Sequence, residues 1–179
     1  MKRKYLLISL LLLFLVFGCS FGDNPSAKVA ALLKKYNNGD DVVKTELGDY
    51  LNSLSLDNTS KLSYQDVYLR QYSDLTYEIK NERIDGNYAV VTVQIRVYDY
   101  YTAESKLNNY IGTHQAEFYD ENGVYDPAVA FNYRIDQLKK VSDKIDYTLD
   151  FTLTKINDEW TIDTLTNDML EKIHGTYAH

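Results

Sequence analysis

The chain has 179 residues, a single cysteine and a formal net charge of −7. One cysteine excludes both a disulfide-built fold and a cysteine-ligated metal cluster. The acidic balance argues against a nucleic-acid partner, because a negatively charged domain repels the phosphate backbone.

The first residues have the pattern of a secretory signal peptide. Lys2, Arg3 and Lys4 are followed by an uncharged run of 13 residues, 5–17. This run is too short to cross the hydrocarbon core of a bilayer, which needs about 20 helical residues. A basic start, a short apolar run and a small residue before the cleavage point are typical of a signal peptide, here residues 1–18.

The segment Val16-Phe17-Gly18-Cys19 resembles the lipobox of bacterial lipoproteins. There, a small residue precedes a cysteine that is lipidated and becomes the new N-terminus. The resemblance implies that acylated Cys19 holds the protein in the lipid bilayer, on the extracytoplasmic face of a Gram-positive cell membrane. Residues 19–24 would then be the lipidated cysteine and a short tether. The alternatives are an ordinary secreted protein with a spare thiol and an uncleaved anchor.

Cleavage after residue 18 would also change the charge of the protein. The three basic residues of the leader would be lost with no acidic residue, which takes the formal charge from −7 to −10. The acidic mature domain is therefore expected not to adhere to the anionic membrane surface, although the short tether, residues 20–24, keeps it close to the membrane.

Apolar residues at helical spacing predict three helices after the tether. The first begins at Asn24-Pro25, a capping residue followed by proline, and ends at Asn37-Asn38-Gly39. The second begins at Asp40 or Asp41, and the third begins at about Ser60.

The apolar period then changes from 3.6 to 2, which indicates strands. A first strand from Leu75 and a turn at Asp85-Gly86 lead into the clearest strand of the chain. Its inward-facing residues are expected to be Ala89, Val91, Val93, Ile95 and Val97. Two further strands lie near 145–154 and 160–163, with a turn at Asn157-Asp158 between them, and a last helix begins at Thr166.

A helical insert over roughly 102–143 separates the two hairpins. Its first helix begins at Thr102, and its second begins at Asp126-Pro127. The first helix is expected to present one stripe of Leu107, Tyr110, Ile111, His114 and Phe118. Together the elements predict an α+β domain over residues 25–179, with a curved four-stranded antiparallel sheet packed on helices.

Two segments carry a family resemblance: TYEIKNERIDGNYAVVTVQIRVYDY at 76–100, and YTLDFTLTKINDEWTIDTL at 147–165. With the leading helices, they resemble uncharacterised lipoproteins of Gram-positive bacteria, whose domains are similar to the cystatin-like or nuclear-transport-factor-like cone. That superfamily includes ketosteroid isomerases, dehydratases and many non-enzymatic binding domains. The fold alone therefore does not select a function.

Known catalytic and metal-binding signatures are absent from the sequence. It has no nucleophile elbow, phosphate loop or dinucleotide fingerprint, and no pair of histidines at the spacing of a metal-binding helix. The loop at Asp120 lacks the late glutamate of a calcium loop. We expect no cofactor and no metal.

The best acid/base candidate is Asp99, which is in phase with Val97 and would point into the covered face of the sheet if the strand continued. A carboxyl group in an apolar setting can shuttle protons near neutral pH. Tyr101, Tyr110 and His114 are expected to complete a candidate ligand-binding site around it. The alternative is that Asp99 caps the following helix.

A separate histidine, His174, is predicted to lie in the last helical turn, where the helix dipole favours a cation, and to have a structural capping role there.

Three hypotheses follow. The first is a non-enzymatic, membrane-tethered domain that binds an envelope protein or a small ligand, neither of which the sequence identifies. The second is a small cone-fold enzyme of isomerase or dehydratase type, with Asp99 acting on a hydrophobic ligand. The third is a structural envelope protein that binds through the acidic, threonine-rich face of its sheet.

Overall fold

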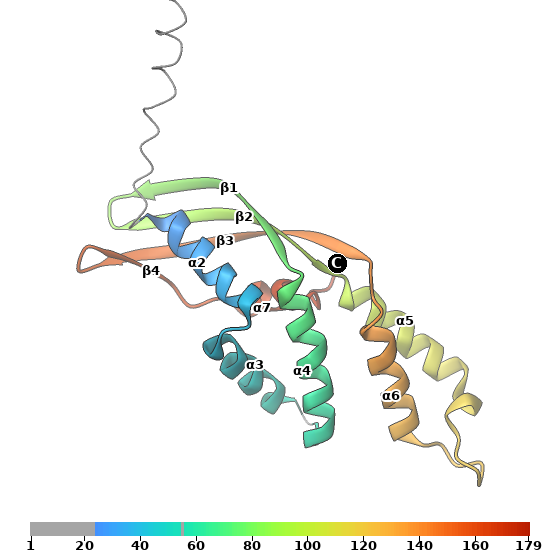
Figure 1. Ribbon diagram of the computed structural model, residues 1–179. Helices are drawn as coiled ribbons and strands as arrows, with labels where there is room; N and C mark the ends of the chain where they lie inside the picture. The colour runs from blue at the N-terminus through green and yellow to red at the C-terminus, as the bar shows by residue number, and fades with distance from the viewer. Residues whose placement is uncertain (1–23, 55) are drawn as a thin grey trace, which may run out of the picture.

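The computed structural model describes residues 24–54 and 56–179, so the predicted signal peptide and Cys19 lie outside the described residues. The predicted α+β class is confirmed. A curved antiparallel sheet of four strands runs across the molecule, and helices pack on one side of it (Figure 1).

The sheet consists of two hairpins whose strands are neighbours in chain order, β1-β2-β3-β4. The strands are β1 (Thr76–Asp85), β2 (Tyr88–Tyr98), β3 (Lys144–Ile156) and β4 (Glu159–Ile162). The register pairs Val93 with Leu149 at the centre of β2 and β3. A register shift between Ile79 and Asn81 interrupts the pairing of β1 with β2.

The two hairpin turns differ in how well the sequence located them. Asn157 and Asp158 both have positive φ values, 51° and 65°, as the favoured two-residue turn requires. In the first hairpin Asp85 still pairs with Tyr88, so the turn residues are 86–87, one position later than predicted.

The covered face of the sheet confirms the predicted alternation. Val91, Val93, Ile95 and Val97 on β2 are fully buried. On β3 the inward side chains are also buried, namely Tyr147, Leu149, Phe151 and Leu153. The alternating residues Thr148, Asp150 and Thr152 are exposed, so the outer face of β3 is polar.

Helices α2 (Pro25–Asn38), α4 (Asn58–Ser73) and α7 (Asn167–His174) lie against this apolar face, and α3 (Asp41–Ser53) packs on α4. The first turns of α2 and α7 are capped where the sequence indicated, whereas α4 begins at Asn58 and is capped by Asp57. Asn24 accepts a hydrogen bond from the Ala27 amide at 2.6 Å, and Thr166 accepts one from the Met169 amide at 3.3 Å. Among the described residues, no helix has both the length and the hydrophobicity to span a membrane.

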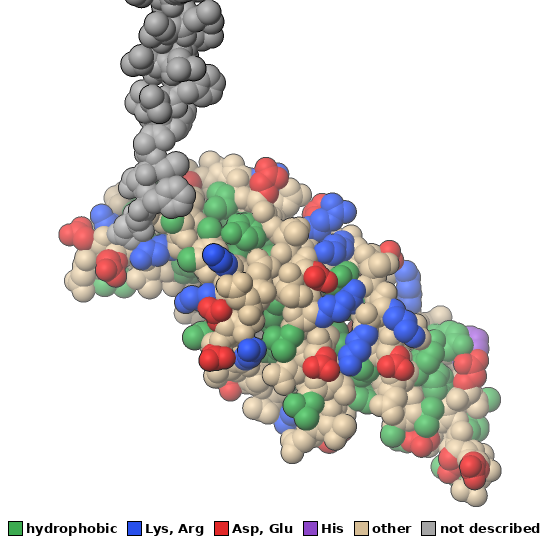
Figure 2. Space-filling view, in the orientation of Figure 1, with side chains coloured by type: hydrophobic (Ala, Val, Ile, Leu, Met, Phe, Trp, Pro, Cys, Tyr) green, Lys and Arg blue, Asp and Glu red, His purple; other side chains and the backbone are tan. Residues whose placement is uncertain are grey.

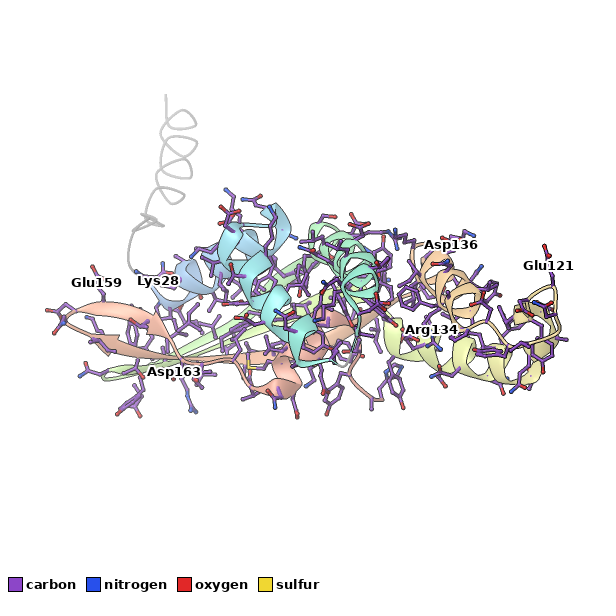
Figure 3. All side chains as sticks on the ribbon, turned by 90° about the horizontal axis from the view of Figure 1, so that it is seen from below. Lys28, Glu121, Arg134, Asp136, Glu159 and Asp163 are labelled. Atoms are coloured by element: carbon purple, nitrogen blue, oxygen red, sulfur yellow. The ribbon has the colours of Figure 1, made fainter. Side chains whose placement is uncertain are left out.

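The insert forms a projection that we call the arm, residues 100–138, and we call the rest of the described chain the body. The arm contains α5 (Tyr100–Thr113), a 3-10 turn η2 (Gln115–Phe118) and α6 (Pro127–Leu138). It extends away from the sheet, and Glu121 near its tip lies at the opposite end of the molecule from Glu159 of the β3–β4 hairpin (Figure 3).

The first helix of the arm differs from the prediction at both ends. It begins at Tyr100 rather than Thr102, because Asp99 caps it, and it ends at Thr113. The predicted stripe therefore does not run along one helix: His114 follows the end of α5, and Phe118 belongs to η2.

A buried glutamine connects three elements of the body next to the base of the arm. The Gln71 side chain of α4 is fully buried. Its Oε1 accepts a hydrogen bond from the Tyr98 amide at 2.8 Å, and its Nε2 donates to the carbonyls of Tyr98 and Ile173 at 3.3 and 3.4 Å. One side chain thus connects α4, the end of β2 and the end of α7.

Candidate functional site

The structure places Asp99 at the start of α5, outside the covered face of the sheet. Strand β2 ends at Tyr98, and the Asp99 carboxylate accepts a hydrogen bond from the Thr102 amide at 2.9 Å. Its other oxygen lies 3.7 Å from Nε2 of His179. The expectation that Asp99 points into the core is therefore corrected. The strand stops because the Asp99 carboxylate satisfies a free amide of the next helix.

The remaining predicted site residues form two separate pairs. Tyr101 is half-exposed, and its ring lies 5.4 Å from that of His179, close to Asp99. Tyr110 stacks on His114 with ring centres 4.1 Å apart. Positions 101 and 110 are about 14 Å apart along the helix axis, at 1.5 Å per residue. The structure therefore does not combine these residues into one site.

Tyr110 makes a further contact at the far end of α5. Its hydroxyl donates to Oε2 of Glu117 at 2.9 Å, and this hydrogen bond is the main reason that the pKa of Tyr110 is raised to about 12. The half-buried Tyr110 and the exposed His114 thus support the local packing of the arm.

A pocket lies in the body, between α2, α3, α7 and the loop that follows β4. Its volume is about 640 Å³, within the range of small-molecule sites. Most of its wall is apolar or aromatic, formed by Leu32, Tyr36, Val43, Leu47, Tyr50, Tyr72, Ile162, Leu165, Leu170 and His174. We call it the His174 pocket.

His174 is the unusual member of this wall. The residue is 4% exposed, and its Nδ1 is buried without a hydrogen-bond partner among the described residues. The imidazole packs among three tyrosine rings, with centre-to-centre distances of 4.7 Å to Tyr50, 5.2 Å to Tyr68 and 5.8 Å to Tyr72. A buried polar atom without a partner is destabilising, by about 1–3 kcal/mol.

Burial lowers the pKa of His174 to about 4, with no contribution from a neighbouring charge. The imidazole is therefore neutral at pH 7, and one ring nitrogen is then a hydrogen-bond acceptor. This corrects the prediction that His174 acts as a cation at the end of the helix. The last turn of α7 is packed against the core, and transfer of a charge into that environment is unfavourable.

Two further tyrosines of the pocket wall, Tyr36 and Tyr72, are held as neutral phenols. Tyr36 and Tyr72 pack edge to face with ring centres 5.1 Å apart. Burial raises the pKa of both phenols, and Glu46 raises that of Tyr36 further. The Tyr36 hydroxyl points to Oε2 of Glu46 at 3.4 Å, so the apolar wall ends at a carboxylate.

The mouth of the pocket is acidic. Glu46 and Asp49 of α3 and Asp163 after β4 (labelled in Figure 3) line it, and all three are exposed. The Asp163 carboxylate also accepts a hydrogen bond from Thr154 at 3.0 Å, which holds it at the sheet edge. No lysine or arginine is among the described residues that line the pocket.

Sequence reasoning did not identify this site, although one signal was present. Leu170 and His174 are four residues apart on a strongly amphipathic helix and therefore share its apolar face. Residues 162–165 of the wall directly precede α7, but the rest comes from α2, α3 and α4 near the start of the chain, and their approach to α7 is a property of the tertiary fold.

Comparisons with known proteins add one weak likeness. No protein-family model and no curated protein matches the sequence. Among solved structures, the chain is similar to the crystal structure of YcdA, a candidate lipoprotein of Bacillus subtilis, with 14% identity and a TM-score of 0.45. The match covers 88% of this chain and 51% of that one, so this chain spans about half the length of YcdA. The cystatin-like resemblance stays a prediction.

Proposed function

We propose that this protein is a lipoprotein of the extracytoplasmic membrane face that binds a small, largely apolar ligand in the His174 pocket. The anchor rests on the sequence, through the basic start, the short apolar run and the Gly18-Cys19 junction. Helix α2 begins at Pro25, six residues after Cys19. A tether of that length reaches about 20 Å when fully extended, so the ligand would be met close to the membrane.

One observation carries the binding role: a pocket of about 640 Å³ with an apolar wall contains a buried imidazole whose Nδ1 has no partner among the described residues. Convergence of apolar walls and a few polar groups is the usual composition of a ligand site. Asp99 has a capping role instead, so the acid/base alternative has no geometric support.

The anchor is tested by replacement of Cys19 with Ala in cells fed a radiolabelled fatty acid. We expect the wild-type protein to carry the label and to sediment with membranes, whereas the variant is unlabelled and is released. An unlabelled wild-type protein that still sediments with membranes would contradict the lipid anchor.

The pocket is tested with indole, a neutral water-soluble probe, by calorimetric titration of the processed full chain in lipid nanodiscs. We expect saturable binding beyond that of empty nanodiscs. Thr164→Trp, at the pocket mouth, should abolish it. Thr148→Trp is the matched control, because Thr148 is exposed on the outer face of β3. Equal heats in all three proteins would overturn the binding role.

A further inference from the structure

The polar groups of the His174 pocket are arranged in two places. On α3, Glu46, Asp49 and Ser53 line the pocket at spacings of three and four residues, so they form one stripe along that helix. Tyr50 belongs to the same face, and its ring lies 4.7 Å from the imidazole of His174. The stripe therefore borders the mouth, while His174 lies at the buried end.

The two places differ in charge. Glu46 and Asp49 are exposed carboxylates, and Lys44, the basic residue of α3, lies 3.8 Å from Asp41 and is not part of the lining. A negative cleft with an apolar wall attracts cations, because the low-dielectric wall focuses the field. A positive group on a ligand is therefore favoured at this mouth over a negative one.

The buried end has a different requirement. A neutral imidazole without a partner among the described residues can accept one hydrogen bond. In the tautomer that leaves Nδ1 unprotonated, a ligand that brings an N–H or O–H group to this atom satisfies it, whereas an entirely apolar ligand leaves it unsatisfied. The phenols of Tyr36 and Tyr72 supply ring faces and edges for an aromatic body between the two ends.

We propose that the His174 pocket binds amphipathic amines: an apolar, preferably aromatic body with a hydrogen-bond donor that meets His174 and a cationic group that meets the Glu46–Asp49 stripe. This assignment rests on the proposed binding function and specifies its ligand class. Neither requirement depends on the arm or on the residues around Asp99.

A matched set of indole probes tests the charge requirement on the processed full chain in nanodiscs. Tryptamine carries a cation and indole-3-propionate carries an anion on similar bodies. We expect tryptamine to bind about tenfold more tightly, the scale of roughly 1.4 kcal/mol, and to lose this advantage in the Glu46→Gln/Asp49→Asn variant. The control is Asp146→Asn, because Asp146 is an exposed carboxylate on β3 outside the pocket.

The donor requirement is tested with the benzofuran analogue of tryptamine, in which a ring oxygen replaces the N–H. We expect about fivefold weaker binding than tryptamine, as for one lost hydrogen bond of about 1 kcal/mol. In His174→Phe the two amines should bind equally. Indole binding to this variant shows whether its pocket is intact. If His174→Phe fails to fold, His174→Gln, which keeps an acceptor, should retain the preference for tryptamine over the benzofuran analogue.

The outcomes separate the two levels of the proposal. If indole binds and Thr164→Trp blocks it, but the cation and the anion bind equally, the ligand class is wrong and the binding function stands. If no probe binds above empty nanodiscs, the binding function itself is wrong. A tryptamine preference that survives in Glu46→Gln/Asp49→Asn would overturn the role of the α3 stripe.

Discussion

The body and the arm are stabilised to different extents. In the body, the apolar face of the sheet and four helices enclose one large core with completely buried members such as Val29, Leu33 and Phe151. The arm has two small clusters, one at its base around Tyr100 and Leu138 and one near its tip around Phe118.

The arm also leaves hydrophobic side chains exposed on its surface. Hydrophobic side chains gather on the outer part of the arm in Figure 2, and several of them are more than 40% exposed: Tyr119, Val124, Tyr125 and Val129. A segment with few buried contacts opens at a lower free energy than the core. We therefore expect the arm to open without the body, and the His174 pocket to be lost only when the body unfolds.

The largest expected contrast comes from the same substitution in the two regions. Phe151→Ala on β3 removes a fully buried ring from the main core and should lower the free energy of global unfolding by about 4 kcal/mol. Phe118→Ala removes a ring that is also almost fully buried, 2% exposed, but near the tip of the arm.

Chemical denaturation and amide hydrogen exchange measure the two effects. Phe118→Ala should accelerate exchange in η2 and α6 and leave the slowest amides of β2 and β3 unchanged. Equal losses of global stability in both variants would show that body and arm unfold as one cooperative unit.

Two glycines with the same backbone conformation provide the second contrast. Gly175 at the end of α7 and Gly123 at the arm tip have φ values of +74° and +76°. A Cβ at Gly175 would lie 2.0 Å from the Tyr98 carbonyl oxygen and 2.5 Å from Nε2 of Gln71, whereas at Gly123 it would meet nothing within 4 Å.

Gly175→Ala should therefore lower stability by about 3–4 kcal/mol, since overpacking adds to the left-handed strain, and Gly123→Ala by about 1 kcal/mol. Urea denaturation curves check both values. A similar, small loss in both variants would mean that the junction at Gln71 relaxes around the new methyl group.

The third contrast compares how a histidine in the body and a histidine in the arm affect stability in acid. His174 has a pKa of about 4 in the folded protein and 6.5 as its model value. Below pH 6.5 His174 binds a proton in the unfolded chain but stays neutral in the folded chain. The free energy of unfolding therefore falls as the pH decreases from about 6.5 to about 4. The loss attributable to His174 approaches about 3 kcal/mol, at 1.36 kcal/mol per pH unit.

We expect His174→Phe to remove this part of the acid sensitivity, measured as the difference in unfolding free energy between pH 7 and pH 4. His114→Phe, on the exposed arm, is the matched control and should respond to acid like the wild type. If His174→Phe keeps the full wild-type loss, the imidazole is not held neutral in the folded state.

The same division of the molecule explains what could be predicted from the sequence. Alternating residues such as Val91, Val93 and Ile95 predicted the covered face of the sheet, because period-2 burial is set locally along one strand. Caps at Asn24 and Thr166 were equally local, each within three residues of its partner.

The candidate site depended on information that local patterns do not contain. The phase of Val97 predicted that Asp99 would point inward, but capping of α5 ended the strand one residue earlier. His174 was interpreted from its place at the end of a helix, whereas its chemistry is set by Tyr50, Tyr68 and Tyr72 from distant segments. Glu46 and Asp49 were not singled out from the sequence: their spacing puts them on one face of α3, but it does not show that α7 lies opposite that face.

The smallest expected effect concerns the attachment of the arm. Arg134 on α6 forms an ion pair with Glu104 on α5, with side-chain exposures of 22% and 26%, and Glu104 also accepts a hydrogen bond from Tyr64 of α4 at 3.3 Å. Lys139 and Asp66 form a more exposed pair, at 43% and 68%.

Because solvent screens exposed pairs more strongly, Arg134→Met should lower the opening free energy of the arm by about 1 kcal/mol, and Lys139→Met by less than about 0.5 kcal/mol. Hydrogen exchange of the α5 and α6 amides measures both. Since Glu104 joins three helices, the effect of Arg134→Met should extend to the first turns of α4 but not to β2 and β3. Faster exchange throughout the sheet would show instead that this ion pair stabilises the body, and that the arm is not an independently opening unit.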